Sequence, residues 1–251
     1  MVTALCVLAA LAGLILVQRL IPLAAREPST AGTEIIYQAL YVMYGVALGF
    51  SLFLTSQQFS EAEGTVLREA SRVEQIYRLV EPFPEQERER VQALAKSYAQ
   101  VVVEEEWSLL GRGSESQASP RAEMIADELR RSIASLEPET SREEALVTQA
   151  VVLVADLEEI RLTRVLERRR GMPSILWSVL VIGGVITVVC TFFFGIKNPW
   201  LHGGSVAALT VVVVVVLYAI YRIEYPYTGD IRVRPEAFEL MLQRIESNNG
   251  G

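Results

Sequence analysis

Four long apolar runs constrain the fold of this chain more than any other feature. They lie at about residues 2–23, 35–56, 173–196 and 201–223, and charged residues are almost absent from them. A helix that crosses the hydrocarbon core of a bilayer needs about 20 consecutive, mostly apolar residues. Each run is long enough, so the sequence predicts four transmembrane helices with a lipid bilayer as their surroundings.

The segment between the second and third runs has the opposite character. Residues 57–172 contain 16 Arg and Lys against 23 Asp and Glu, and the difference (16 − 23 = −7) equals the net charge of the whole chain. A surface that binds nucleic acid is basic, so this acidic balance argues against a nucleic-acid partner. We expect a separate, water-exposed domain in this segment.

Apolar residues in this segment recur at helical spacing throughout. The second span is expected to continue as a helix to about residue 80, and further helices are expected at about 85–110 and 120–136. A last helix begins near Ser141. Its start fits a capping box with Ser141 as the N-cap and Glu144 at the third helical position.

The positions of arginine and lysine predict the orientation of the spans, because these residues accumulate on the cytoplasmic side. Arg68 and Arg72 follow the second span, and an arginine run at 168–170 precedes the third. The two short connections contain only one arginine, Arg26, and one lysine, Lys197. We therefore expect a multi-pass protein of the plasma (inner) membrane with both termini cytoplasmic.

The predicted fold class is an all-α membrane protein, with four transmembrane helices and a helical-bundle cytoplasmic domain between the second and third spans. The first transmembrane pair occupies residues 1–56, and the cytoplasmic helical domain occupies 57–172. The second transmembrane pair occupies 173–223. A cytoplasmic tail with a short amphipathic helix follows at 224–251.

Residue types that support catalysis or metal binding are scarce. His202 is the only histidine, and both cysteines, Cys6 and Cys190, fall inside predicted spans. The sequence has no glycine-rich phosphate loop, and acidic runs such as 104–106 are expected to form a solvated helix face. The sequence therefore predicts no enzymatic activity, no cofactor and no metal site.

The second span is the most informative element, because its helical wheel separates two kinds of face. The side opposite the lipophilic face carries small or hydrogen-bonding residues in two adjoining stripes. The first stripe consists of Tyr37, Tyr41, Tyr44, Leu48, Ser51 and Thr55, and the second of Gln38, Gly45, Gly49 and Ser56. Two interpretations fit. These stripes pack against another helix, where small residues permit close approach, or they contact water as the wall of a pore in an oligomer.

A second group of candidate residues lies on the predicted cytoplasmic helices. Arg161, Arg164 and Arg168 share one helix face, and Glu69 and Glu74 lie on the helix that continues the second span. Opposite charges on neighbouring helices can form a charge network. The alternative is that the arginines only mark the cytoplasmic side of the membrane.

Three further stretches of the sequence resemble known sequence patterns and are informative together. The first is GVALGF at residues 45–50, and the second is the arginine-rich helix that ends at Met172-Pro173. The third is a membrane-exit motif, EYPYTG, which contains Glu224, Pro226 and Gly229. Together these stretches resemble the bacterial bestrophin-like domain family over nearly the whole chain.

The exit motif departs from the family pattern at two positions. The family usually shows an acidic residue, Arg, Pro, Phe and then Gly, whereas this chain has Tyr225 in place of the Arg and Tyr227 in place of the Phe. A role that depends on the family's arginine therefore cannot be transferred to this chain.

The resemblance implies a function as well as a fold. Bestrophins proper are pentameric anion channels whose second span lines the pore. The expectation is therefore an oligomeric bestrophin-like membrane channel or permeation pathway for small ions, lined by the second span, with further copies of the chain as partners. The alternative is a non-conducting membrane scaffold or sensor whose cytoplasmic helical bundle binds a protein partner. Likeness of fold alone does not separate the two.

Overall fold

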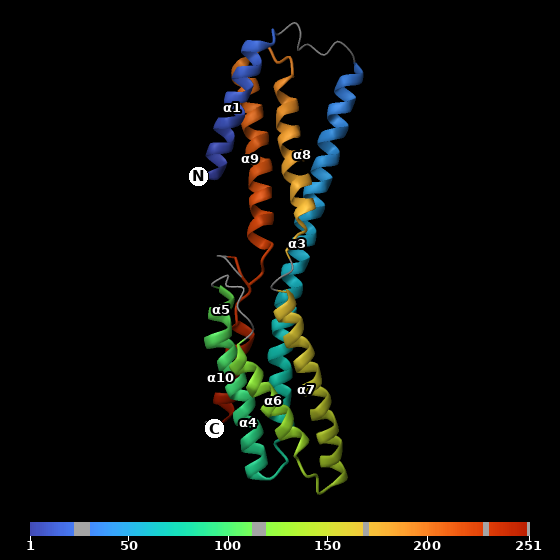
Figure 1. The fold of residues 1–251 in the computed structure, drawn as a ribbon, viewed down its shortest axis with the longest axis vertical. Coiled ribbons are helices and arrows are strands. Elements are labelled where there is room, and N and C mark those ends of the chain that lie inside the picture. The colour runs from blue at the N-terminus through green and yellow to red at the C-terminus, as the bar shows by residue number, and fades with distance from the viewer. Residues whose placement is uncertain (23–30, 112–118, 168–170, 228–230, 250–251) are drawn as a thin grey trace. The chain divides into compact units, whose positions relative to one another are not determined.

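A computed structural model describes residues 1–22, 31–111, 119–167, 171–227 and 231–249. Within these ranges every regular element is a helix (Figure 1), which confirms the predicted all-helical class. The chain divides into two compact units. We refer to residues 1–57 and 172–224 as the apolar unit, and to residues 58–171 and 225–251 as the charged unit.

Among the described residues, the apolar unit holds four helices that are long and apolar enough to cross a membrane. They are α1 (Val2–Leu20), the first part of α3 (Ala31–Leu79), α8 (Ser174–Phe192) and α9 (Pro199–Ile223). Their apolar windows have mean hydropathies between 1.6 and 2.4. These helices coincide with the four runs that the sequence singles out.

Close packing in the apolar unit places small residues opposite large ones. Helix α1 packs against α8 and α9, and a Cβ added at Gly13 would lie 2.9 Å from the ring of Phe192. Ala10, Leu14 and Val206 are buried with Phe192 in the same cluster. The glycine permits the close approach that helix pairs in lipid require.

A polar contact joins the same three helices. His202 on α9 is buried, and its Nε2 lies 2.9 Å from the carbonyl oxygen of Thr191 on α8. Its Nδ1 lies 3.4 Å from the side-chain amide of Gln18 on α1. A neutral ring that donates from Nε2 and accepts at Nδ1 satisfies both partners. The only histidine of the chain therefore has a structural explanation.

The charged unit is a helical bundle around one hydrophobic core. It contains the second part of α3, α4 (Glu85–Val101), α5 (Trp107–Gly111), α6 (Pro120–Ala134), α7 (Ser141–Glu167) and α10 (Glu236–Asn249), with a π-helical turn, η1 (Val102–Glu106), between α4 and α5. Helix α3 ends before Pro82 and Pro84, because proline cannot continue a helix. Val66, Val73 and Ile76 form the buried stripe of α3 at helical spacing.

The C-terminal segment belongs to this bundle and is not a free tail. Helix α10 packs against α4, and Phe238, Met241 and Ile245 are buried in the core. The indole of Trp107 donates to the carbonyl of Val233 at 3.2 Å. The amphipathic helix expected in the tail therefore contributes one wall of the bundle.

The capping box at the start of α7 lies one residue earlier than predicted. Thr140 is the N-cap in place of Ser141: its Oγ1 accepts from the Glu143 N–H at 3.2 Å, and Glu143 Oε2 accepts from the Thr140 N–H at 3.3 Å. The same carboxylate oxygen accepts a second bond from the Glu139 N–H at 2.7 Å. Both frames fit the sequence pattern, and the additional bond accounts for the use of the earlier one.

The helix predicted over about residues 85–110 is interrupted by η1. A π-turn closes i→i+5 hydrogen bonds and so accommodates more residues per turn than an α-helix. Glu106, which was expected on a solvated face, is only 2% exposed, whereas Glu104 two residues earlier is exposed. The prediction for Glu106 was wrong, because it treated the acidic run as one solvated face, whereas Glu106 lies four residues after the buried Val102 and so on the buried side of the helix.

Candidate functional site

The first stripe of α3 is packed inside the apolar unit. Tyr44, Leu48, Ser51 and Thr55 are each at most 9% exposed in the single chain. The hydroxyl of Tyr44 donates to the carbonyl of Leu180 on α8 at 2.9 Å. For these residues the structure favours the helix-packing interpretation.

Two glycines of α8 make this packing possible. A Cβ added at Gly183 would lie 2.8 Å from the ring of Tyr44, and one added at Gly184 would lie 2.7 Å from the Tyr44 hydroxyl. Further along α3, the ring centroids of Tyr37 and Tyr41 lie 5.5 and 6.2 Å from that of Phe194. The tyrosine rings of the first stripe therefore pack within their own chain, and the Tyr41 hydroxyl is buried without a hydrogen-bond partner among the described residues.

The second stripe of α3 is left uncovered by the part of the chain that the structure describes. Gln38, Gly45 and Gly49 are exposed, and a Cβ added at either glycine would have no neighbour within 4 Å. Val46 and Phe50 beside them are 67% and 61% exposed. This group, which we name the open face of α3, is available for contact with lipid, water or another copy of the chain.

A buried charge network occupies the core of the charged unit. Arg164 on α7 donates from Nε to Glu69 Oε2 at 2.5 Å and from Nη2 to Glu69 Oε1 at 3.1 Å, so the pair is bidentate. Arg164 Nη2 also donates to Glu106 Oε2 on η1 at 2.6 Å. All three side chains are at most 2% exposed. One guanidinium group thus joins three helical segments in the core.

Arg161, almost one turn earlier on α7, extends the network. Its Nη2 lies 3.4 Å from Glu106 Oε1 and donates to the carbonyl of Ser119 at 3.3 Å. On the other side of the network, the Tyr98 hydroxyl donates to Glu69 Oε1 at 2.5 Å. Two buried guanidinium groups therefore face two buried carboxylates, and their formal charges cancel.

Pairing determines which groups in the network are ionised. Burial opposes ionisation of Glu106, but the guanidinium groups of Arg164 and Arg161 outweigh it and hold the Glu106 pKa below its ordinary value. Burial also opposes the charge of Arg164, yet the Glu69 and Glu106 carboxylates raise the Arg164 pKa well above its ordinary value. Burial, followed by the charge of Glu69, raises the pKa of Tyr98, so this phenol stays a hydrogen-bond donor.

The structure brings together only some of the residues predicted for this network. Arg164 pairs with Glu69, whereas Arg161 pairs with Glu106. Glu74 instead pairs with Arg78 on its own helix at 2.5 Å and with Arg244 of α10 at 3.6 Å. Arg168 lies outside the described residues.

Two members of the network were not identified from the sequence. Glu106 belongs to an acidic run, but it lies four residues after Val102 and so continues the buried side of α4. Tyr98 lies on the apolar side of α4, and the role of its hydroxyl depends on where Glu69 lies on another helix. The helical spacing of Tyr98, Val102 and Glu106 is the local signal of both residues.

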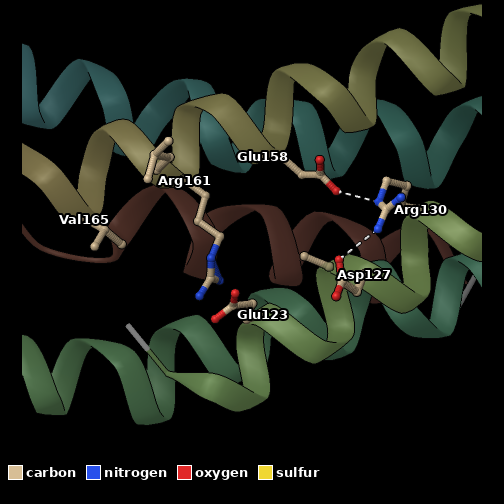
Figure 2. A pocket seen from close by; sticks show the side chains of 8 residues that line it. Glu123, Asp127, Arg130, Glu158, Arg161 and Val165 are labelled. Carbon is tan, nitrogen blue, oxygen red and sulfur yellow. Dashed lines mark hydrogen bonds and ion pairs between the residues drawn. The ribbon is translucent and has the colours of Figure 1, made fainter. Parts of the chain in front are cut away.

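An open pocket of about 340 Å³ lies between α6 and α7. Figure 2 shows Arg161 extending from α7 toward Glu123 on α6, while Arg130 bonds to Asp127 and Glu158 at 3.1 and 3.0 Å. Among the side chains that line the pocket, two guanidinium groups face three carboxylates. The lining therefore has no excess of positive charge to attract an anion.

Glu224, the first residue of the membrane-exit motif, forms hydrogen bonds that connect two helix ends in the apolar unit. It is 3% exposed, and its Oε1 accepts from the Met172 N–H at 2.7 Å while its Oε2 accepts from the Trp177 indole at 3.0 Å. The carboxylate therefore joins the end of α9 to the start of α8. In the charged unit the carbonyl of Pro226 accepts from the Val233 N–H at 2.7 Å. Gly229 lies outside the described residues.

Comparisons with known proteins agree with this architecture. A family model described as the Bestrophin-like domain matches residues 4–238. A point variant of a bacterial Bestrophin homolog from Klebsiella pneumoniae superposes with a TM-score of 0.72 at 12% identity, over 100% of both chains. Another structure of a Klebsiella pneumoniae homolog gives a TM-score of 0.66 at 14% identity, over 98% of this chain and 96% of that chain.

A third solved structure, described as a membrane protein, gives a TM-score of 0.67 at 13% identity over 99% of each chain. A comparison with curated proteins gave no match. At these identities the solved structures support the fold alone. The family model, in contrast, covers nearly the whole chain, and we conclude that this protein belongs to the Bestrophin-like domain family.

Proposed function

We propose that this protein is the subunit of an oligomeric membrane channel for small ions, lined by the open face of α3. The observation that carries the proposal is the contrast between the two sides of this helix. Tyr44 and Ser51 are buried in the chain, whereas Gly45, Val46 and Gly49 are covered by none of its described residues. The bestrophins proper, which this sequence resembles, line their pore with the same span.

The glycines support a role in assembly over simple contact with lipid. Packing inside the chain does not explain Gly45 and Gly49, because a side chain at either position would meet nothing within 4 Å. In a ring of α3 helices, Gly45 and Gly49 would lie where each helix meets both its neighbour and the ion pathway, and small residues there permit close approach and leave the helix surface open to water. Val46 and Phe50 would then form apolar rings, and such constrictions gate ion flow by excluding water.

The proposed orientation follows the arginine distribution, with the charged unit and both termini in the cytoplasm. Cysteines introduced at Ser135 and Lys197, in a chain whose Cys6 and Cys190 are replaced by alanine, test it in intact cells. A membrane-impermeant thiol reagent added outside should label position 197 and not position 135. Labelling of position 135 alone would contradict the orientation.

Ion flux in reconstituted liposomes tests the function. The purified oligomer should dissipate a salt gradient, and Val46→Ala should raise the flux because it widens the apolar ring. Val179→Ala is the matched control, because Val179 is 55% exposed on α8 and lies outside the proposed lining. An assembled oligomer that passes no ion under any salt, pH or voltage tested would overturn the channel proposal.

One observation favours the alternative of a non-conducting scaffold or sensor. The outer face of α7 in the charged unit exposes aliphatic residues, among them Leu162 at 59% and Val152 at 55%. Exposed apolar patches of this kind mark interaction sites. If the oligomer passes no ions and this face binds another protein, the scaffold function replaces the channel.

A further inference from the structure

Between residues 151 and 166, α7 has a single charged residue among its exposed side chains, which form the outer face of the helix. That face carries Val151, Val152, Ala155, Glu159, Leu162 and Leu166, all exposed. Helices α3 and α6 flank α7 without covering it: Asp156 pairs with Arg72 of α3 at 3.3 Å, and Glu158 pairs with Arg130 of α6 at 3.0 Å. Between these two contacts, the described part of the chain leaves the face open.

Such a face is unfavourable in water. The solvent side of a surface helix is normally polar, and apolar surface left in water is less favourable than the same surface buried against another helix. Aliphatic residues continue over four turns, from Val151 to Leu166. The face has the composition of a helix contact and not that of a solvated surface.

The outward side of α3 in the same unit carries small residues around one exposed leucine. Ser60, Gly64 and Ser71 lie there with small side chains, and a Cβ added at Gly64 would meet nothing within 4 Å. Leu67, in the same row, is 63% exposed. The small residues leave room for large side chains of another helix, and Leu67 supplies an apolar contact for them.

Charge supports the same pairing. Arg68 on this side of α3 is exposed, and its bonds go to uncharged groups, the Gly64 carbonyl at 3.3 Å and the Thr65 hydroxyl at 3.2 Å. Glu159 is the one acidic residue on the outer face of α7, and no cation within the described residues pairs with its carboxylate. An arginine and a glutamate that have no ionic partner among the described residues thus lie on the two faces.

The contacts inside one chain show which residues of α3 and α7 lie at the same height, or level, along the helix axes. Arg72 pairs with Asp156, and the Thr65 hydroxyl donates to Glu167 at 3.1 Å, so α3 and α7 are antiparallel. At 1.5 Å per residue, position 68 lies at the level of about residue 162. In a ring whose axis runs along the helices, copies keep the same levels. Arg68 of one copy would then lie within a turn of Glu159 in the next.

We propose that the outer face of α7 in one copy docks on the Ser60–Ser71 side of α3 in the next copy. The two faces are different, so the contact is heterologous and closes into a ring when the rotation between copies permits it. This inference rests on the oligomeric state of the proposed channel. It assigns to the charged unit a defined share of the subunit interface, with Leu162 as its apolar centre.

Disulfide trapping of the full-length protein in membranes tests the contact. In a chain with Cys6→Ala and Cys190→Ala, the pair Ser71→Cys and Ala155→Cys lies at nearly one level and should yield disulfide-linked dimers and higher multimers on oxidation. The control pair, Ser71→Cys with Thr148→Cys, keeps the helices but is offset along them by roughly 14 Å. The control should give only monomers.

Each other outcome has a distinct meaning. Multimers from Ala155→Cys alone would show a two-fold α7–α7 contact and overturn the heterologous pairing. An intact oligomer in nanodiscs without cross-links from the designed pair would overturn this inference and leave the channel proposal in place. A monomer in nanodiscs would overturn both. Cross-links to a different membrane-associated protein would overturn the inference in favour of the scaffold.

Charge reversal supplies an independent readout. Arg68→Glu and Glu159→Arg should each lower the assembled fraction several-fold, because each places like charges opposite one another. The double variant should restore assembly. Failure of the double variant to recover, with helical content unchanged by circular dichroism, would contradict the proposed register.

Discussion

In the core of the charged unit, three helical segments depend on the guanidinium group of Arg164. Replacement of a buried, paired charge leaves its partners unpaired in a low-dielectric interior, which costs about 3–5 kcal/mol. We expect Arg164→Met to lower the free energy of unfolding of the full chain by that amount, because Glu69 would lose its guanidinium partner and Glu106 would keep only Arg161. Denaturant unfolding of the detergent-solubilised protein measures it.

Arg130→Met is the matched control. Arg130 also pairs with two carboxylates, Asp127 and Glu158, but its side chain is 55% exposed. Water screens these pairs, so the control should change stability little. Equal losses in the two variants would show that the buried network does not stabilise the bundle.

The stability contributed by the same network depends on pH through the ionisation of Glu106. Its pKa in the folded protein lies below the ordinary value because Arg164 and Arg161 outweigh the effect of burial. The unfolded chain therefore binds a proton first on acidification. The stability that Glu106 contributes is complete above the ordinary glutamate pKa of about 4.3 and is lost as pH falls toward the lower folded pKa.

Glu106→Gln should remove this part of the acid sensitivity. Thermal melting of wild type and variant between pH 7 and pH 3 provides the comparison: the variant should melt lower at pH 7, and the difference should narrow with acidification. A constant difference across this range would show that ionisation of Glu106 does not contribute to stability.

At the scale of single helices, the contact between α3 and α8 depends on the absence of a side chain. A Cβ at Gly184 would lie 2.7 Å from the Tyr44 hydroxyl and 3.2 Å from Val213. Overpacking of this kind typically costs about 1–3 kcal/mol. We expect Gly184→Ala to lower the thermal stability of the detergent-solubilised protein, and Tyr44→Phe to recover part of the loss by removing the hydroxyl.

Gly204→Ala on α9 is the control for the general effect of replacing a helical glycine by alanine. A Cβ at that position would meet nothing within 4 Å, so its stability should stay the same or rise slightly. A comparable loss in both variants would indicate that the fit against Tyr44 is not the cause.

Helical periodicity predicted the faces of α3 but not their partners. The wheel placed Tyr44 and Ser51 on a different side from the lipophilic residues, because side-chain direction follows from residue spacing alone. It could not distinguish packing from pore lining, since both favour small and polar residues. The partner of Tyr44 lies 136 residues away on α8, and that contact is a property of tertiary structure.

For the whole molecule, the number and length of the apolar helices follow from the four long uncharged runs in the sequence. A membrane-spanning helix is one of the few structures that accommodate such a run. The packing of α10 into the bundle did not follow, because a short amphipathic helix gives no sign of where its apolar side docks. The burial of Glu106 was likewise missed, because its partners Arg164 and Arg161 lie on another helix, 58 and 55 residues away. Long-range contacts are therefore what the sequence pattern misses.

The central claim is that the open face of α3 lines an ion pathway, and thiol modification during electrical recording tests it most directly. Gly49→Cys and Ser51→Cys are compared in a chain without Cys6 and Cys190, reconstituted in planar bilayers. Position 49 is exposed, whereas Ser51 is 9% exposed within the chain. We predict that a positively and a negatively charged thiol reagent shift the current through Gly49→Cys channels in opposite directions and leave Ser51→Cys channels unchanged. Modification at position 51 without modification at position 49, or an assembled protein that carries no current, would contradict the account.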